Sequence, residues 1–367
     1  MRLMPRGALD CAAANPPATV SASGMGERSG IPASGSAGRT GTSVRDLWVE
    51  ATSVASKAIA PLLKAGDLVI LETTVPARAT EDVMAPILET SGLSARRDFH
   101  VAHCPETVLP GNMIYELAHN HRVVGGLTPE ATEKARELYA SFVRSEIVTT
   151  DATTAELVKL IENTYRDVNI ALANEIALVA HRLGVDSREA IKIANKHPRV
   201  HIHHPGPGVG GHCIPIDPHY LAWKMRGLNY KTRFIDLAGE LNTEMPMFWV
   251  RKLAEALNGQ GKAVRGASVL VLGVAYKRDI DDIRESPALD IIRLLEGQGA
   301  RVTYFDPHVP RFREDGQEFR SVELTPEAVA AADCVMIVTD HTAVDYRMIK
   351  RKAKLVVDTR NAIPKEV

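Results

Sequence analysis

The sequence predicts an α/β protein in which two doubly wound α/β domains are joined by a long central helix and a helical middle domain. Three observations predict this fold class. Helix and strand patterns alternate over residues 45–149, and the alternation returns over residues 263–362. Between them, Asp151–Leu183 contains neither proline nor glycine, which is typical of one long helix. Alternating helices and strands favour parallel sheets.

The first 44 residues form a segment of a different kind. Glycine, alanine, serine and proline dominate it, and the first aromatic residue of the chain is Trp48. Such a composition buries too little apolar surface to offset chain entropy, so we expect disorder. The elements expected after it are a helix at 44–63, a strand at 67–72, a helix at 79–90 and a strand at 99–103.

The middle domain, residues 150–258, is predicted to be helical. Asp151 and Thr153 are N-cap candidates for the long helix, and Gly184 is its expected end. Further helices are expected at 187–196 and 231–257, with a loop rich in glycine, proline and histidine at 197–218. A wide apolar stripe on these helices predicts a homodimer interface along the long helix.

The last hundred residues predict a second doubly wound unit. The expected strands are 268–274, 301–305, 334–338 and 354–358, and the expected helices are 287–296, 326–332 and 345–352. The turn after its first strand begins at Gly273 and lacks the GxGxxG pattern. We therefore expect this domain to bind a nucleotide but not a dinucleotide pyrophosphate.

Composition excludes several classes of protein. The 367 residues carry 44 basic and 45 acidic side chains, a net charge of −1, which does not suit a dedicated nucleic-acid binder. No apolar run approaches the ~20 residues of a membrane span. The four cysteines lack CxxC spacing and the loop histidines lack ligand spacing, so we expect the reducing cytoplasm and no metal.

The glycine-rich segment GPGVGGHCIPIDP, residues 206–218, is the most informative. Cys213 ends its glycine run before a helix expected near Pro218, whose dipole could stabilise a thiolate. Cys213 is therefore a candidate covalent nucleophile, with Asp217 close by. The alternative is a buried structural cysteine in a tight loop.

Other polar residues suggest chemistry, although each has a structural alternative. Lys159 and Asn163 share one helix face and could donate to an oxyanion, or the lysine could be solvated at a core edge. Glu106 and Thr74 each follow a strand. Glu106 could act as a general base, and the Thr74 hydroxyl could orient water or bind a cofactor, or both could be ordinary loop residues. A charge-dense turn with Lys277 could hold phosphate or carboxylate, or be solvated.

Together these segments closely resemble the UDP-glucose/GDP-mannose dehydrogenase family, over about residues 45–362. The motifs that carry the resemblance, in this order, are TTVP, CPE, VKLIENTYRDVNIALANE, GVGGHCIPIDP, AYKRDIDDIRESPA and YFDPHVP. The family oxidises C6 of a nucleotide sugar from alcohol to carboxylate with two NAD⁺ per turnover. The resemblance implies two Rossmann-like domains, the first for NAD and the second for UDP.

The resemblance also implies roles for single residues. Cys213 would form a thiohemiacetal and then a thioester with C6, Lys159 and Asn163 would stabilise the oxyanion, and Asp217 would tune the lysine and the water. Glu106 would be the general base, and Thr74 would orient water and contact the cofactor. The implied binding residues are Lys277, Arg360, Arg199 (lent across the dimer) and Gly210 for the substrate and Arg284 for the cofactor.

The HCIPIDP form is most similar to UDP-N-acetylhexosamine 6-dehydrogenases, which implies UDP-N-acetylglucosamine or UDP-N-acetylmannosamine as substrate and surface polysaccharides as the destination. UDP-glucose or GDP-mannose is an alternative substrate. A third possibility is a catalytically defective, dimeric UDP-sugar-binding remnant.

The chain departs from the family at its start. No GxGxxG occurs in the first 150 residues, so we interpret residues 45–149 as the remnant of an NAD-binding domain whose first sheet has an open edge. We expect NAD⁺ to bind poorly or not at all. Isothermal titration tests this, and micromolar binding would contradict it.

Overall fold

The computed structural model describes residues 44–108, 112–314 and 316–364. The segment that we expect to be disordered lies outside them, apart from Val44. None of the helices in these ranges is long and apolar enough to cross a membrane.

The first domain follows the predicted alternation and adds elements that the sequence analysis did not name. Its elements are α1 (Val44–Ile59), η1 (Ala60–Leu62), β1 (Leu68–Leu71), η2 (Thr80–Met84), α2 (Ala85–Leu88), η3 (Glu89–Ser91), β2 (His100–His103), α3 (Met113–His119), β3 (Arg122–Gly126), α4 (Pro129–Ala140) and β4 (Ile147–Asp151). The helix predicted at 79–90 is confirmed as a continuous helical segment over residues 80–91, although its turns change from π to α to 3-10 geometry. Pro86 has no N–H to donate to the preceding turn, which is a π-helical turn.

The sheet of this domain is not fully parallel, which corrects the prediction. Its strand order is β1-β2-β3-β4, and β3 runs antiparallel to β2. Helix α3 lies in the connection from β2 to β3, and β3 begins near the end at which β2 stops. Among the described residues, β1 pairs only with β2, so its other edge is open, as expected.

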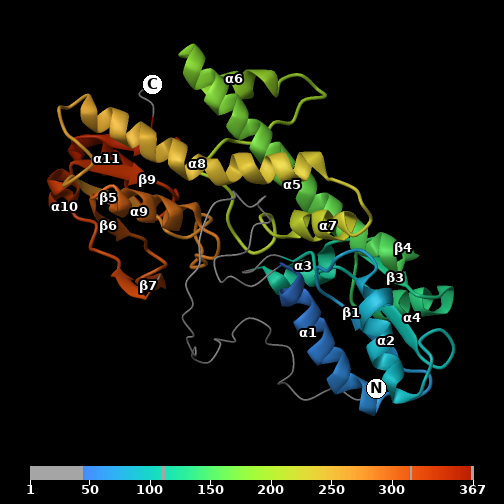
Figure 1. Ribbon diagram of the computed structural model, residues 1–367. Helices are drawn as coiled ribbons and strands as arrows, with labels where there is room; N and C mark the ends of the chain where they lie inside the picture. Colours follow the sequence, from blue (N-terminus) through green and yellow to red (C-terminus); the bar gives the residue numbers. More distant parts are fainter. Residues whose placement is uncertain (1–43, 109–111, 315, 365–367) are drawn as a thin grey trace, which may run out of the picture. The chain divides into compact units, whose positions relative to one another are not determined.

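The middle domain is helical, as predicted. It consists of α5 (Ala152–Leu183), α6 (Ser187–Ala194), α7 (Asp217–Arg226) and α8 (Arg233–Asn258). Asp151, and not Thr153, caps α5 by accepting the Thr154 N–H at 2.9 Å, and Gly184 ends the helix in the left-handed conformation. The long helices α5 and α8 pack against each other (Figure 1).

The C-terminal domain is a doubly wound parallel sheet. It contains β5 (Ser268–Leu272), α9 (Pro287–Gly297), β6 (Arg301–Phe305), β7 (Arg311–Glu314), β8 (Gln317–Arg320), α10 (Pro326–Ala331), β9 (Cys334–Ile337), α11 (Tyr346–Lys352) and β10 (Val356–Asp358). The strand order is β10-β9-β5-β6, so the chain adds β6 on one side of β5 and then adds β9 and β10 on the other side. Parallel sheets of this kind bind ligands at the point between the two sides, here between β5 and β9. The small β7–β8 hairpin was not predicted.

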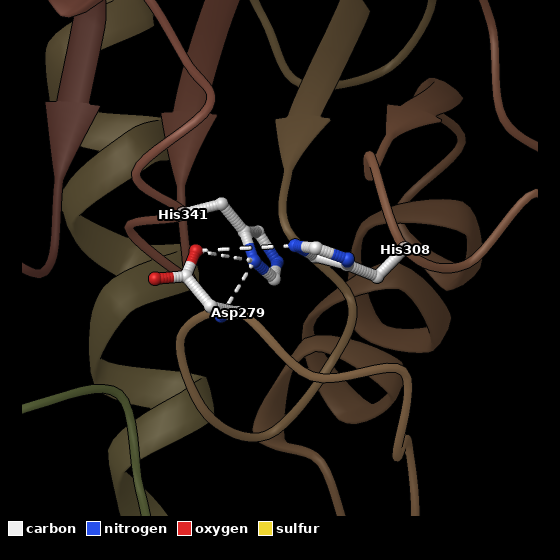
Figure 2. Close-up of side chains that lie close together, drawn as sticks. All are labelled: Asp279, His308 and His341. Atoms are coloured by element: carbon white, nitrogen blue, oxygen red, sulfur yellow. Dashed lines mark hydrogen bonds and ion pairs between the residues drawn. The ribbon is translucent and has the colours of Figure 1, made fainter. Parts of the chain in front are cut away.

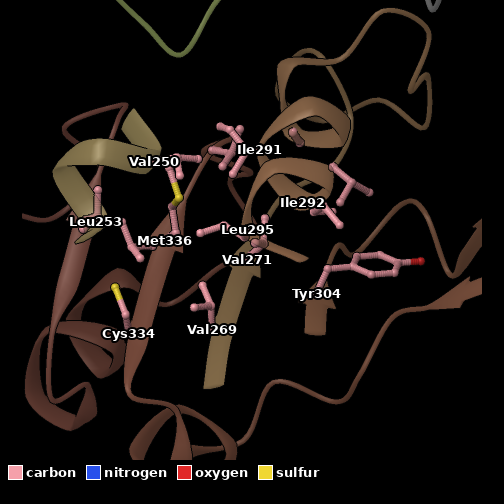
Figure 3. Packing of buried hydrophobic residues seen from close by; sticks show 14 of the residues in the cluster. Val250, Leu253, Val269, Val271, Ile291, Ile292, Leu295, Tyr304, Cys334 and Met336 are labelled. Carbon is pink, nitrogen blue, oxygen red and sulfur yellow. The ribbon is translucent and has the colours of Figure 1, made fainter. Parts of the chain in front are cut away.

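The core of this domain includes one end of α8. Val250 and Leu253 of α8 are fully buried against β5, β9 and α9, beside residues such as Val271 and Met336 (Figure 3). The other half of α8 packs on α5, with Ile235 and other residues buried. One helix therefore packs against the C-terminal sheet at one end and against α5 over its other half.

Candidate active site

Four of the predicted residues meet where α5 packs on α7. Lys159 and Asn163 lie one turn apart on α5, and Asp217 is the first residue of α7. The Asn163 amide donates to the Asp217 carboxylate, with 2.5 Å between Nδ2 and Oδ2. Cys213 lies in the turn before α7, where its carbonyl accepts the Asp217 N–H at 2.8 Å. Charges on both Lys159 and Asp217 act on its thiol.

The environment of Cys213 keeps the thiol protonated. Burial and the Asp217 carboxylate raise its pKa, and they outweigh the opposing effects of Lys159 and Arg284. Stabilisation of a thiolate by the dipole of α7 stays a prediction. Cys213 is nonetheless exposed at the surface, in contrast to Cys104 and Cys334, so the alternative of a buried structural cysteine does not hold.

The Asp217 carboxyl is poised to exchange a proton near neutral pH. Burial raises its pKa to about 7, against the hydrogen bond from Asn163 and the positive charge of Lys159. A carboxyl whose pKa matches the working pH suits acid–base chemistry. Lys159 is itself mostly covered, and its Nζ lies 4.0 Å from the Glu162 carboxylate.

The glycines of the cysteine loop allow the close approach that the sequence suggested. A Cβ at Gly210 would lie 2.6 Å from the Tyr276 Cβ and 2.8 Å from the Glu285 carbonyl oxygen. Gly211 has φ of 90°, and its N–H donates to the Arg284 carbonyl at 2.9 Å. The loop thus rests directly on the backbone of residues 276–285.

We expect Gly210→Ala to reduce kcat by about 10²-fold, because the methyl group has to displace the loop that carries Cys213. Steady-state kinetics measure this, and the thermal unfolding midpoint shows whether the variant remains folded. Gly297→Ala is the matched control, since its Cβ would meet nothing within 4 Å. An unchanged kcat in Gly210→Ala would mean that the loop position does not matter.

A buried amide network anchors the start of the cysteine loop, and the sequence analysis did not find it. The Gly206 N–H donates to Asn174 Oδ1 at 2.9 Å, and the Trp249 indole donates to the Gly206 carbonyl at 3.1 Å. Asn174 Nδ2 donates to Asn242, whose amide donates to the Asp167 carboxylate at 2.8 Å. The seven-residue spacing of Asp167 and Asn174 on α5 is the signal that could have revealed this polar face.

The predicted residues of the first domain are Thr74 and Glu106. Thr74 follows β1 and Glu106 follows β2, and among the described residues no hydrogen bond or ion pair links either to Cys213, Lys159 or Asp217. Glu156, a buried residue of α5, was not among the predicted site residues. Its carboxylate accepts bonds from the Thr80 N–H and hydroxyl at 2.7 and 2.6 Å and from the Arg78 N–H, which ties the loop after β1 to α5.

The predicted cations of the middle and C-terminal domains differ in their surroundings. Lys277 is exposed, while Arg284 forms a two-pronged ion pair with Asp282, with 2.7 Å at its shortest contact. Arg360 donates to the Val338 carbonyl at 2.7 Å, and burial lowers the pKa of its guanidinium. Arg199 is exposed, and its side chain makes no hydrogen bond or ion pair within the described ranges.

The carboxyl end of β2 carries buried polar atoms without partners in the described part of the chain. These are both ring nitrogens of His103 and the hydroxyl of Thr107. Such atoms fit the hydroxyl and amide groups of a polar ligand such as the ribose and nicotinamide of NAD. The described residues include no glycine-rich turn from a strand to a helix, so they supply only part of a dinucleotide site.

Profiles of one protein family match three consecutive parts of the chain. These are the UDP-glucose/GDP-mannose dehydrogenase family NAD binding domain at residues 42–143, its central domain at 153–244 and its UDP binding domain at 270–365. They agree with the first sheet, the helical part and the C-terminal sheet.

Whole-chain comparisons agree with these matches. The UDP-N-acetyl-D-mannosamine dehydrogenase of Methanococcus maripaludis is 41% identical over 317 residues, which is 84% of this chain and 70% of that protein. The NDP-N-acetyl-D-galactosaminuronic acid dehydrogenase of Ralstonia solanacearum is 39% identical, over 83% of this chain and 73% of that protein.

A solved structure is also similar. The UDP-D-ManNAc dehydrogenase from Pyrococcus horikoshii superimposes with a TM-score of 0.79 at 41% identity, over 87% of this chain and 74% of that chain. The chain therefore belongs to the UDP-glucose/GDP-mannose dehydrogenase family and is an NAD-dependent nucleotide-sugar dehydrogenase.

Proposed function

We propose that the chain oxidises the C6 alcohol of a UDP-N-acetylhexosamine to a carboxylate through a thioester on Cys213. The observation that carries this proposal is the convergence of Cys213, Lys159, Asn163 and Asp217 at the contact of α5 and α7. An accessible thiol, an ammonium group, an amide and a carboxyl that titrates near neutral pH are the groups that acyl chemistry at an aldehyde needs.

The four groups divide the chemistry among them. Sγ of Cys213 attacks the C6 aldehyde, and its proton passes to Asp217, whose raised pKa suits that transfer. Lys159 and Asn163 donate to the oxygen that becomes negative as the C–S bond forms. NAD⁺, contacted by Thr74 and Arg284, would supply the acceptor for the hydrides that leave C6. Water, activated by Glu106 and oriented by Thr74, then cleaves the thioester and frees the thiol.

Binding of the substrate and the cofactor is the remaining part of the proposal. Lys277, Arg360 and the backbone at Gly210 would hold the nucleotide sugar, with Arg199 contributed by a second copy. Thr74 and Arg284 would contact NAD. The free thiols in the described part of the chain suit a reducing compartment, so we place the reaction in the cytoplasm.

A panel of nucleotide sugars tests the substrate class. We favour UDP-N-acetylmannosamine because relatives near 40% identity carry that sugar in their names. The panel also contains UDP-N-acetylglucosamine, UDP-glucose and GDP-mannose, and kcat/KM is followed through NADH formation. A preference for UDP-glucose or GDP-mannose would refute the proposal. Binding of UDP without NADH formation with any sugar would favour the defective remnant.

We further propose a homodimer through α5. Exposed apolar side chains follow one face of this helix at spacings of four and seven residues. They are Ile161, Tyr165, Leu172, Val179 and Leu183. At ~100° per residue, this stripe lies on the side opposite to Lys159 and Asn163. A second copy packed on the stripe would cover it and leave the reactive face free.

The double variant Leu172→Glu, Val179→Glu should be monomeric at concentrations at which the parent chain is dimeric, because two carboxylates per subunit would have to lose water in the interface. We expect the dissociation constant to rise by at least about 10²-fold in sedimentation equilibrium. Leu228→Glu is the control, since Leu228 is exposed but lies outside α5. An unchanged dimer would place the interface elsewhere.

A further inference from the structure

Three side chains of ligand type converge at the carboxyl edge of the C-terminal sheet. Asp279, His308 and His341 follow strands β5, β6 and β9, and they point toward one another (Figure 2). The Asp279 Oδ1 atom lies 3.9 Å from His308 Nε2 and 3.8 Å from His341 Nδ1. None of these three residues has a role in the reaction proposed above.

A metal ion is the obvious occupant, but the hydrogen bonds argue against it. The fully buried His341 uses both ring nitrogens: Nε2 lies 3.0 Å from Asp306 Oδ2, and Nδ1 lies 3.0 Å from the Asp279 backbone nitrogen. Asp279 Oδ1 in turn accepts the Thr342 N–H at 2.8 Å. A cation would have to displace an amide from the lone pair of Nδ1.

Asp306 provides a fixed point for this network. Its buried carboxylate accepts the backbone N–H groups of Val274, Ala275, His308 and Val309 at 2.7–3.1 Å. These bonds and His341 lower its pKa to about 2, so it is ionised and can only accept. His341 must then donate from Nε2, which leaves Nδ1 as the acceptor for Asp279.

The backbone that His341 holds is the one that carries the proposed substrate contact. Asp279 has φ of 61°, which is unfavourable for a residue with a side chain and needs support from its surroundings. Lys277 lies two residues earlier. The same segment continues to Glu285, against which the cysteine loop rests at Gly210.

We propose that His341 is a positioning residue: it transmits the fixed position of Asp306 to the backbone of Asp279 and thereby holds Lys277 toward the nucleotide sugar. This inference rests on the proposed function, because it assumes that Lys277 contacts the substrate. The part of the ligand that this position would serve is the diphosphate, the charged part of the nucleotide sugar. The effect should therefore appear in substrate affinity more than in the chemical step.

Two variants separate the contacts of His341 without emptying its buried site. In His341→Gln the amide nitrogen replaces Nε2 and keeps the bond to Asp306, while the acceptor for Asp279 is lost. In His341→Asn the amide oxygen replaces Nδ1 and keeps that acceptor. We expect His341→Gln to raise KM for the sugar about five- to tenfold with kcat within about twofold, and His341→Asn to lie closer to the parent chain.

His308→Ala is the control, because His308 is partly exposed and its Nε2 lies 3.9 Å from Asp279 Oδ1, beyond hydrogen-bond distance. We expect its KM to be unchanged. If His308→Ala raised KM as much as His341→Gln, and a chelator did the same to the parent chain in a way that Zn²⁺ reversed, a metal site would replace our proposal. An unchanged KM in folded His341→Gln would also overturn it.

Hydrogen exchange at the Asp279 amide keeps this test independent of turnover. We expect faster exchange in His341→Gln than in the parent chain or in His308→Ala, whichever sugar the enzyme uses. Equal exchange in all three would refute the anchoring of the loop by His341. Faster exchange in His341→Gln with unchanged affinity for UDP would refute the role of His341 in substrate binding. Absence of turnover with every sugar would count against the proposed function alone.

Discussion

Cys213→Ala should abolish carboxylate formation, with a fall in kcat of at least about 10³-fold. Loss of a nucleophile typically costs this much or more, and no other described cysteine is exposed to take its place. Chromatography of the nucleotide-sugar products measures the acid directly. Mass spectrometry of the acid-quenched parent enzyme should show the acyl group on the peptide that contains Cys213.

Cys334→Ala is the matched control for this variant. Its thiol is buried in the core of the C-terminal sheet, where burial raises its pKa to about 12. We expect normal acid formation together with a modest loss of stability. Retained turnover in Cys213→Ala would remove the thioester from the mechanism, although it would leave the family assignment intact.

Asp217→Asn should have the second largest effect, a fall in kcat of about 10²- to 10³-fold. In the parent enzyme we expect kcat to fall as the pH drops through about 7, because the carboxyl then gains a proton and no longer serves as a base. The asparagine variant should lose this dependence. A pH profile that keeps the same inflection in Asp217→Asn would assign it to another group.

The same substitution should increase stability at alkaline pH. The folded-state pKa of Asp217 lies above its unfolded value of ~4. The folded form therefore loses stability as the pH rises from about 4 through about 7, when a buried carboxyl has to ionise. At pH 8 we expect Asp217→Asn to be more stable than the parent chain by on the order of 1–3 kcal/mol. Thermal unfolding should show this gain shrinking at pH 5.

Local sequence signals predicted the regular elements well. The uninterrupted helical run of α5 and its caps at Asp151 and Gly184 needed no tertiary information. The four strands of the C-terminal sheet were also placed correctly, because buried parallel strands are short, continuous apolar runs. The irregular turn before Pro86 could have been anticipated from the missing N–H alone.

Tertiary features were beyond the sequence. Nothing local distinguishes a β3 antiparallel to β2 from a parallel one, since the apolar pattern of a strand does not encode its direction. Motif resemblance suggested Cys213 and Asp217. The residues that hold them, such as Asn174 and Asn242, are 68 positions apart and meet only in the folded chain. His341 and Asp306, 35 positions apart, escaped notice for the same reason.

The sharing of α8 has a consequence for how the molecule denatures. Val250 and Leu253 lie in one apolar core, and Ile235 lies at the other end of the same helix against α5. The contacts of α8 with α5 and its contacts with the C-terminal sheet both require the helix to be intact. Unfolding of either region therefore destabilises the other. Residues 150–364 should therefore lose their structure in one cooperative transition, with coincident curves from calorimetry and circular dichroism.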